Sequence, residues 1–424
     1  MANALTTQYP FYSRAYGGYT NSQEDFIREM LGQVSGKSIL DPMAGQGYAL
    51  SQLSWEGANV TLGDLNPATL AMASLRDPSV IRKRRTLTRW LQEVIARLSS
   101  KRRRKPPSRI VEGWIDPSIA TDLHDYASMI GIGLFSNPFD SNSTFWSDDL
   151  NARFGAAIAI LAARDIACFR TSDNVTWLKP GGVARSYRIV KPLEKSLAKW
   201  NEYAEQTAEG NERIRNSTSG SLNIELMNVA QGNLGRSRKS PWIITSPPYA
   251  NRLDYTRMWA PEIQVLATMS GANPDEMRLS QIGTTVVEGI DFSEEEKLLP
   301  AYVRSSLSEI RDDPTKYSDI YYYPFFRNYA VTLAAGMRIL ARKLRVGGTM
   351  LVFIRDTTRK DVLFQAGRLV SSVLTSADSG LTETVCERKV IRQHIGYVRK
   401  SSSKGLYGLA QQEWWLAFKK PSKS

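Results

Sequence analysis

The stretch KSILDPMAGQG, residues 37–47, determines the fold class of this chain. Its first five residues, KSILD, resemble a short buried strand, which ends where a glycine-rich turn begins. Gly45 and Gly47 let the backbone turn tightly and approach a ligand, because glycine has no Cβ to clash. A helix follows the turn, so we expect a strand–turn–helix unit at this point of the chain.

A second strand and a second helix follow along the chain. NVTLGD (59–64) has the pattern of a strand. NPATLAMASL (66–75) has that of a helix, with Asn66 as its cap and Pro67 at its first position. The order strand, helix, strand, helix predicts an α/β fold built on a parallel sheet.

Asp64 ends the second strand, 23 residues after Asp41. An acid at this point of an α/β sheet commonly binds the ribose hydroxyls of a nucleotide-like cofactor. The alternative is structural, with Asp64 as a helix-entry cap after an ordinary glycine-rich turn. The loop differs from the G-x-G-x-x-G pattern of dinucleotide-binding proteins, and it lacks the GK[ST] of a P-loop.

The composition is that of an ordinary globular protein, with 42% hydrophobic and 23% charged residues among 424. No apolar stretch reaches the roughly 18 residues of a membrane span, and the N-terminus lacks the pattern of a signal peptide. Because the cysteines are Cys168 and Cys386 and the histidines His124 and His394, we expect no disulfide framework, metal site or Ser-His triad. A cytoplasmic protein without a membrane partner is expected.

Most of the net charge of +13 is concentrated in one segment. Between Arg82 and Arg109 the chain has twelve lysine or arginine residues and one acid, Glu93. Such a cluster favours a polyanionic partner, above all nucleic acid, and a solvated linker is the alternative. The candidate phosphate-binding residues are Arg82, Lys83, Arg84, Arg85, Lys101, Arg102, Arg103, Arg104, Lys105 and, outside the segment, Arg252.

The α/β pattern is interrupted at about residue 80 and resumes at about 220. Helical spacing of apolar residues predicts helices at 82–98, 154–169, 193–214, 254–269, 329–344 and 360–374. Strands are expected at 222–228, 241–245, 349–356, 381–391 and 413–420, the last two antiparallel, with a turn at VGG (346–348) and a loop-rich stretch at 270–325. The expected domains are a core of 1–79 and 220–424, and a mainly helical, basic insertion of 80–219 as the candidate for target recognition.

The stretch IITSPPY (243–249) carries a second motif. A buried strand stops at two prolines, which donate no hydrogen bond and make the following loop stiff. Ligands of open α/β sheets bind at such carboxyl ends of strands. Both proline carbonyls and the Ser246 hydroxyl are expected to be free acceptors, and Tyr249 offers a flat face, which suits a planar group carrying an NH2. An ordinary tight turn with Tyr249 in the core is the alternative.

Together, DPMAGQG and TSPPY resemble the motifs of the amino-group DNA methyltransferases, which methylate exocyclic amines of cytosine or adenine. The first resembles their D-P-x-A-G-x-G cofactor loop, and the second resembles their catalytic [SND]-P-P-[YFW] motif. RLDY (252–255) and LRVGGTMLVFIRD (344–356) are similar to further segments of that family. The resemblance covers roughly 10–75 and 220–420 and implies a Rossmann-like class I methyltransferase core with a mixed sheet.

The resemblance implies S-adenosylmethionine as the cofactor. The loop at 41–47 would surround its methionine part, and Asp64 would bind its ribose. Tyr16 and Thr20 lie where the first cofactor-contact segment of the family would be, and Asn228 lies near the position beside the adenine. The implied cofactor-binding residues are Asp41, Pro42, Ala44, Gly45, Gly47, Asp64, Asn228, Tyr16 and Thr20.

The catalytic residues implied by the resemblance are Ser246, Pro247, Pro248 and Tyr249. An aromatic amine is a poor nucleophile, because its lone pair is delocalised into the ring. Hydrogen bonds from its N–H groups to Ser246 and to the Pro247 carbonyl would favour a tetrahedral nitrogen that attacks the methyl group in line. In duplex DNA the base must be flipped out, and Tyr249 is the expected stacking partner. A Pro-Cys nucleophile is missing, which disfavours methylation of a ring carbon.

Serine in this motif favours cytosine N4 as the target within the family, and adenine N6 is the alternative. Methylation of an RNA base, and a non-catalytic DNA-binding protein with a degenerate methyltransferase fold, are two further hypotheses. Double-stranded DNA is the expected partner, with a cognate restriction endonuclease or a defence-system protein as a further candidate.

Overall fold

The computed structural model describes residues 19–101, 110–132, 137–140, 149–171, 178–184, 186, 188–235, 239–251, 254–286, 292–314, 317–359, 362–390 and 412–422. The chain divides into two compact units. The first unit comprises Met1–Met227, Leu234–Arg236 and Asp254–Met277, and the second comprises Asn228–Asn233, Ser237–Leu253 and Arg278–Ser424.

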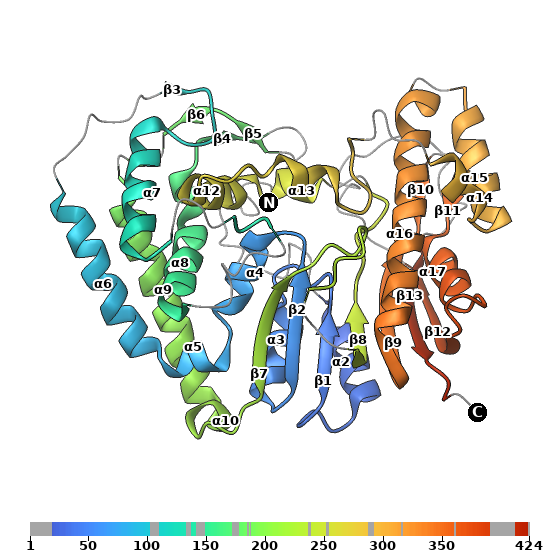
Figure 1. Ribbon diagram of the computed structural model, residues 1–424, viewed down its shortest axis with the longest axis horizontal. Coiled ribbons are helices and arrows are strands. Elements are labelled where there is room, and N and C mark those ends of the chain that lie inside the picture. The colour runs from blue at the N-terminus through green and yellow to red at the C-terminus, as the bar shows by residue number, and fades with distance from the viewer. Residues whose placement is uncertain are drawn as a thin grey trace. The chain divides into compact units, whose positions relative to one another are not determined.

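The first unit contains parallel strands in the predicted order (Figure 1). β1 (Ser38–Asp41) pairs with β2 (Asn59–Asp64), and β2 pairs with β7 (Ser221–Leu226). The helices α2 (Asn21–Leu31), α3 (Tyr48–Trp55) and α4 (Pro67–Ser74) precede or follow these strands. The Rossmann-like α/β class expected from the sequence is confirmed.

The start of α4 is formed by the two residues that the sequence predicted there, Asn66 and Pro67. The Asn66 side chain accepts a hydrogen bond from the Ala68 N–H at 2.9 Å, and Pro67 occupies the first helical position. Both residues act as predicted, since a proline at this position has no N–H to leave unpaired and the asparagine oxygen satisfies one of the free amides.

The insertion is mainly helical, as predicted. It contains α5 (Pro78–Arg82), α6 (Arg84–Ser100), α7 (Pro117–Met129), α8 (Leu150–Ile166), α9 (Val190–Gly210) and α10 (Glu212–Arg215). Two short antiparallel pairs were not predicted: β3 (Ile110–Val111) with β6 (Gly182–Val183), and β4 (Phe169–Arg170) with β5 (Lys179–Pro180). Two residues are too few to show an alternating pattern. After β7 and outside the insertion, α11 (Tyr255–Met258) and α12 (Ala260–Ser270) lie in the same unit, and α13 (Asp275–Leu279) begins there.

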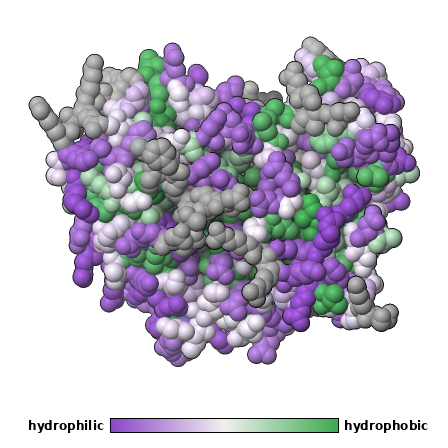
Figure 2. Space-filling model, in the orientation of Figure 1, coloured by the Kyte–Doolittle hydropathy of each residue, from purple (hydrophilic) through white to green (hydrophobic). Residues whose placement is uncertain are grey.

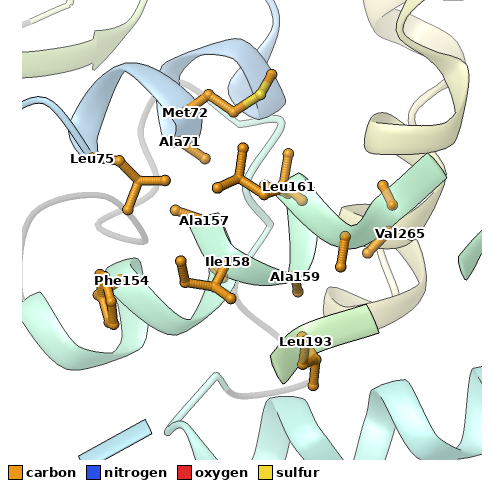
Figure 3. Packing of buried hydrophobic residues seen from close by; sticks show 14 of the residues in the cluster. Ala71, Met72, Leu75, Phe154, Ala157, Ile158, Ala159, Leu161, Leu193 and Val265 are labelled. Carbon is orange, nitrogen blue, oxygen red and sulfur yellow. The ribbon is translucent and has the colours of Figure 1, made fainter. Parts of the chain in front are cut away.

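One continuous apolar core joins the insertion to α4. Met72 and Leu75 of the α4 segment belong to the same core as Ile158 and Leu161 of α8, and Leu161 points toward α4 (Figure 3). Helix α8 is buried around most of its circumference, which is typical of a helix at the centre of a bundle. The insertion and the first strands therefore share one core within the first unit, and the role of 80–219 in target recognition stays a prediction.

A buried ion pair links α8 to α12 inside this unit. The Arg164 Nε donates to Glu262 Oε1 at 2.6 Å, and its Nη2 donates to the Met258 carbonyl at 3.1 Å. The side chains are 9% and 1% exposed, so neither charge is solvated by bulk water. Each charge is tolerated only because the other lies against it.

The second unit has a mixed sheet. β8 (Ser240–Thr245) pairs in parallel with β9 (Leu344–Arg355), β9 pairs antiparallel with β13 (Gln412–Lys419), and β13 pairs antiparallel with β12 (Thr382–Val390). The other elements are α14 (Ser293–Lys297), α15 (Ala301–Asp312), the π-helix η3 (Ser318–Tyr322), α16 (Tyr323–Lys343), α17 (Ala366–Leu374) and the hairpin of β10 (Thr357–Arg359) and β11 (Val362–Phe364).

Three expectations for the second unit were wrong. The stretch expected to be loop-rich contains the 12-residue helix α15. The VGG sequence lies inside β9, where Gly347 has a φ of 74° and the pairing with β8 shifts its register, so the glycines make an irregularity in the strand. The helix expected from residue 360 begins only at Ala366, because Val362–Phe364 form β11. A short apolar run alone does not distinguish a strand from a helix.

The molecular surface is mixed. On the face drawn in Figure 2, hydrophilic side chains are interspersed with smaller apolar areas. None of the helices in the described part of the chain combines the length and the apolar character needed to cross a membrane.

Replacing Arg164 by Met is expected to lower the free energy of unfolding by about 3–5 kcal/mol, because the Glu262 carboxylate is then buried without its cation. Replacing both residues by Met removes the uncompensated charge, and this double variant should regain most of the loss. Urea unfolding of both variants at one pH measures the two values. Equal destabilisation of the single and the double variant would show that packing and not charge holds α8 to α12.

Candidate functional site

The 41–47 loop, from Asp41 to Gly47, leaves the carboxyl end of β1. Gly45 and Gly47 have φ values of 55° and 59°, in the left-handed region that disfavours side chains. The Ala44 N–H donates to the Gly63 carbonyl at 2.8 Å and fastens the loop to β2. The backbone of the turn therefore requires both glycines, as the sequence predicted.

Asp64, at the end of β2, closes this loop. Its Oδ2 accepts a hydrogen bond from the Gly45 N–H at 2.7 Å, and its Oδ1 accepts one from the Asn66 N–H at 2.8 Å. Burial raises the pKa of Asp64 to about 6, and the main-chain N–H groups oppose this rise. The residue is still partly exposed, and each carboxylate oxygen can accept a second hydrogen bond, so Asp64 retains capacity for ligand hydroxyls.

Asp41 is buried, and both oxygens of its carboxylate accept hydrogen bonds from other groups of the protein. Its Oδ2 accepts the Tyr19 hydroxyl at 2.9 Å, and its Oδ1 accepts the Met43 N–H at 3.1 Å. Sequence reasoning missed Tyr19, because no local pattern connects it with a residue 22 positions away. The Asp41 carboxylate thus shapes the 41–47 loop from within.

Tyr16, Thr20 and Pro42 are three further residues that the sequence predicted as cofactor contacts. Tyr16 lies outside the described residues. Thr20 caps α2 in a capping box with Gln23, in which each side chain accepts the other residue's main-chain N–H. A threonine followed by glutamine three residues later is a known cap signature, so the sequence contained this signal. Pro42 is buried in the 41–47 loop.

Asn228 lies in the second unit, where it closes a turn with Asn233. Its side-chain N–H donates to Gln231 Oε1 at 2.9 Å, and its side-chain oxygen accepts the Gln231 N–H at 3.2 Å. The amide of Asn228 is engaged in this turn, and its contact with an adenine stays a prediction.

The SPPY loop, Ser246–Tyr249, follows β8 in the second unit. The Ser246 Oγ lies 3.3 Å from the Tyr249 hydroxyl. Tyr329 of α16 donates its hydroxyl to the Pro248 carbonyl at 2.8 Å. The expectation of free acceptors was therefore wrong for Pro248, whereas the Pro247 carbonyl accepts no hydrogen bond from the described residues. The Ser246 hydroxyl is not free either, because it lies within hydrogen-bond distance of the Tyr249 hydroxyl, but its two lone pairs leave it capacity to accept a further hydrogen bond.

A cation and its carboxylate partner support Tyr249. The Arg355 guanidinium lies 5.4 Å from the centroid of the Tyr249 ring, within the range of about 6 Å for such contacts. Glu413 accepts the Arg355 Nε–H at 2.7 Å and, through its other oxygen, the Trp415 indole N–H at 3.0 Å. Burial raises the pKa of Tyr249 and Arg355 opposes this rise. Sequence reasoning missed these three supporting residues, because only strand pairing brings them near the loop.

Part of the basic segment is engaged within the first unit. Arg84 and Arg85 both pair with Glu205, Arg82 donates to a serine hydroxyl at 2.8 Å, and Lys101 pairs with an aspartate at 3.0 Å. In the described part of the chain, the exposed cations of α6 and its N-terminal flank that form no ion pair are Lys83, Arg89 and Arg97. The predicted contacts Arg102, Arg103, Arg104, Lys105 and Arg252 lie outside the described residues.

No family model and no curated protein matches this chain. Among solved structures, the chain is similar to the rRNA methyltransferase aviRa from Streptomyces viridochromogenes, with a TM-score of 0.30 and 11% sequence identity over 98% of this chain and 93% of that chain. A similarity at this level supports no argument about function, so the following assignments depend on the residues and their geometry.

Gly47→Ala is expected to destabilise the protein through backbone strain and through overpacking. Gly47 has a φ of 59° and a ψ of 26°, in the left-handed region where alanine suffers a backbone strain of about 1–2 kcal/mol. A Cβ on Gly47 would also lie 2.2 Å from Leu62 Cδ1. We expect overpacking to add about 1–3 kcal/mol to the loss, measured by urea unfolding. A total loss no larger than the backbone strain would show that Leu62 moves aside without cost.

Proposed function

We propose that this protein is an S-adenosylmethionine-dependent methyltransferase that acts on the exocyclic N4 amine of cytosine in DNA. The SPPY loop carries this proposal. It offers a hydroxyl oxygen on Ser246 and the Pro247 carbonyl as acceptors, next to the aromatic ring of Tyr249. Two acceptors and a planar surface match an aromatic amine with two N–H groups.

The residues of the first unit fit the proposed cofactor, which when bound supplies a methyl group activated by a sulfonium. The partly exposed Asp64 carboxylate can accept the ribose hydroxyls in addition to its main-chain partners. Both side-chain polar atoms of Gln46 are buried without a hydrogen bond, which a native protein tolerates at few places outside functional sites. The 41–47 loop would line the methionine part.

The acceptors of the SPPY loop would increase the nucleophilicity of the amine. Hydrogen bonds from the two N–H groups to Ser246 and Pro247 favour a tetrahedral nitrogen, whose lone pair is then no longer delocalised into the base. As the nitrogen forms its bond to the methyl carbon, the bond from that carbon to the sulfonium sulfur would break. Both acceptors would stabilise the positive charge on the nitrogen until one proton is lost. Tyr329 fixes the Pro248 carbonyl, so the acceptors are positioned before the substrate binds.

The acceptors of this loop also fit the N6 amine of adenine, and an RNA base presents the same amines. Incubation with labelled S-adenosylmethionine and either duplex DNA or total RNA, followed by mass spectrometry of the nucleosides, separates these substrates. We expect N4-methylcytosine from DNA. N6-methyladenine or a methylated RNA base would select one of the alternatives, and transfer to neither nucleic acid would contradict the proposed function.

Ser246→Ala is expected to lower kcat roughly 100-fold, because one of the two acceptors that act in the transition state is removed. The affinity for S-adenosylmethionine should change less than about threefold, since Ser246 does not belong to the 41–47 loop. Initial rates and isothermal titration calorimetry measure the two effects. Ser305→Ala, a change of an exposed serine on α15, is the control and should alter neither value. Equal losses of rate and cofactor affinity would contradict the role given to Ser246.

We propose that the exposed cations of α6 contact phosphates of double-stranded DNA. The double variant Arg89→Gln, Arg97→Gln should weaken binding and reduce the slope of log K against log salt by about 1.8, if each residue neutralises one phosphate. Glu93→Gln on the same helix is the control of opposite sign and should leave the slope unchanged or increase it. An unchanged slope in the arginine variant would place the DNA elsewhere.

A further inference from the structure

A buried arginine holds the 41–47 loop from behind. Arg76 follows α4 and has no exposed surface. Its Nη1 donates to the Gln46 carbonyl at 2.7 Å, and its guanidinium lies 5.3 Å from the centroid of the Tyr48 ring. Because burial of a cation is costly, the contacts with the Gln46 carbonyl and the Tyr48 ring offset part of this cost and keep Arg76 in its position. The carbonyl that it holds lies between Gly45 and Gly47.

The helical insertion reaches the same guanidinium through Tyr203 of α9. Burial raises the pKa of Tyr203, and the charge of Arg76 together with side-chain hydrogen bonds to Thr207 and Arg76 opposes this rise. Tyr203, Arg76 and Gln46 all belong to the first unit. A chain of two hydrogen bonds therefore connects a helix of the insertion with the turn of the 41–47 loop.

Two indole groups fix the backbone from which Arg76 extends. The Trp55 Nε1–H of α3 donates to the Arg76 carbonyl at 2.8 Å, and the Trp200 Nε1–H of α9 donates to the Leu75 carbonyl at 3.2 Å. Trp200 is fully buried, and Leu75 packs into the core shared with α8 (Figure 3). The insertion thus contacts this segment at two points. Trp200 binds the Leu75 carbonyl, and Tyr203 contacts the Arg76 side chain.

We infer that Arg76 is a positioning residue for the 41–47 loop and that Tyr203 gives the insertion a part in this role. The guanidinium holds the Gln46 carbonyl, and the amides of Gly45 and Gly47 beside it keep their directions. The insertion then has a task besides any contact with nucleic acid, because it sets the affinity of the loop for its ligand. The identity of that ligand, S-adenosylmethionine, rests on the proposed function, whereas the order of the loop does not.

The test compares Arg76→Met, Arg76→Lys and Tyr203→Phe with the unchanged protein. Hydrogen exchange, followed by mass spectrometry of peptides covering 42–49, reports the order of the loop without any ligand. We expect exchange at least fivefold faster in Arg76→Met and Tyr203→Phe, with partial recovery in Arg76→Lys, which keeps the charge but not the planar donor group. The Kd for S-adenosylmethionine should rise about tenfold in Arg76→Met, since a hydrogen bond from a charged group is lost.

Tyr126→Phe is the matched control. Tyr126 is a fully buried tyrosine of the same unit, and its hydroxyl donates to the Gly155 carbonyl at 2.8 Å, within the insertion. Its loss should lower the stability of the protein without faster exchange in 42–49. Faster exchange of this peptide in the control as well would show that any loss of stability loosens the loop, and would overturn the inference.

The remaining outcomes separate this inference from the proposed function. Unchanged exchange and unchanged Kd in Tyr203→Phe and Arg76→Met would overturn the inference and leave the methyltransferase proposal intact. Absence of cofactor binding by the unchanged protein would contradict the proposed function, while exchange of 42–49 still decides the role of Arg76. If Arg76→Met fails to fold, Tyr203→Phe decides alone, because it removes a single oxygen atom.

Discussion

The hydrogen bond from the Gly45 amide to the Asp64 carboxylate is the constraint on which the first unit depends. It joins the loop after β1 to the end of β2, and it forms only because Gly45 adopts a backbone conformation that other residues avoid. The same contact keeps a carboxylate of raised pKa at the carboxyl ends of parallel strands, where ligands of α/β proteins bind. The same hydrogen bond therefore shapes the turn and positions the carboxylate of the candidate ligand site.

The helical insertion is joined to α4 and to the 41–47 loop through a common core. Helix α8 packs on α4, the Arg164–Glu262 pair ties α8 to α12, and Arg76 connects α9 with the 41–47 loop. Residues 80–219 could thus not be removed without exposing the apolar face of α4. A segment that separates two motifs in the sequence is, in the folded protein, a support for the first of them.

The second unit supports its motif in a comparable way. The two prolines stiffen the SPPY loop locally, and Tyr329 anchors its Pro248 carbonyl from α16. Arg355 and Glu413, which neighbouring strands bring together, support the Tyr249 ring. Acceptors held in place in this manner lose little entropy when a substrate binds, which is how positioning contributes to catalysis. The acceptors that remain are Ser246 and Pro247, and they are the ones that the proposed chemistry needs.

The sequence by itself determined the α/β class, the glycine turn, the cap of α4, the helical nature of the insertion and the two candidate motifs. These features depend on interactions between residues close in the chain, and periodicity and turn chemistry report such interactions directly. Only the tertiary structure decided that Tyr19 occupies the Asp41 carboxylate, that Tyr329 occupies one proline carbonyl and that Arg76 holds the loop. These partners lie 22, 81 and 30 residues apart, and no local pattern encodes which distant side chains meet once the apolar surfaces are buried.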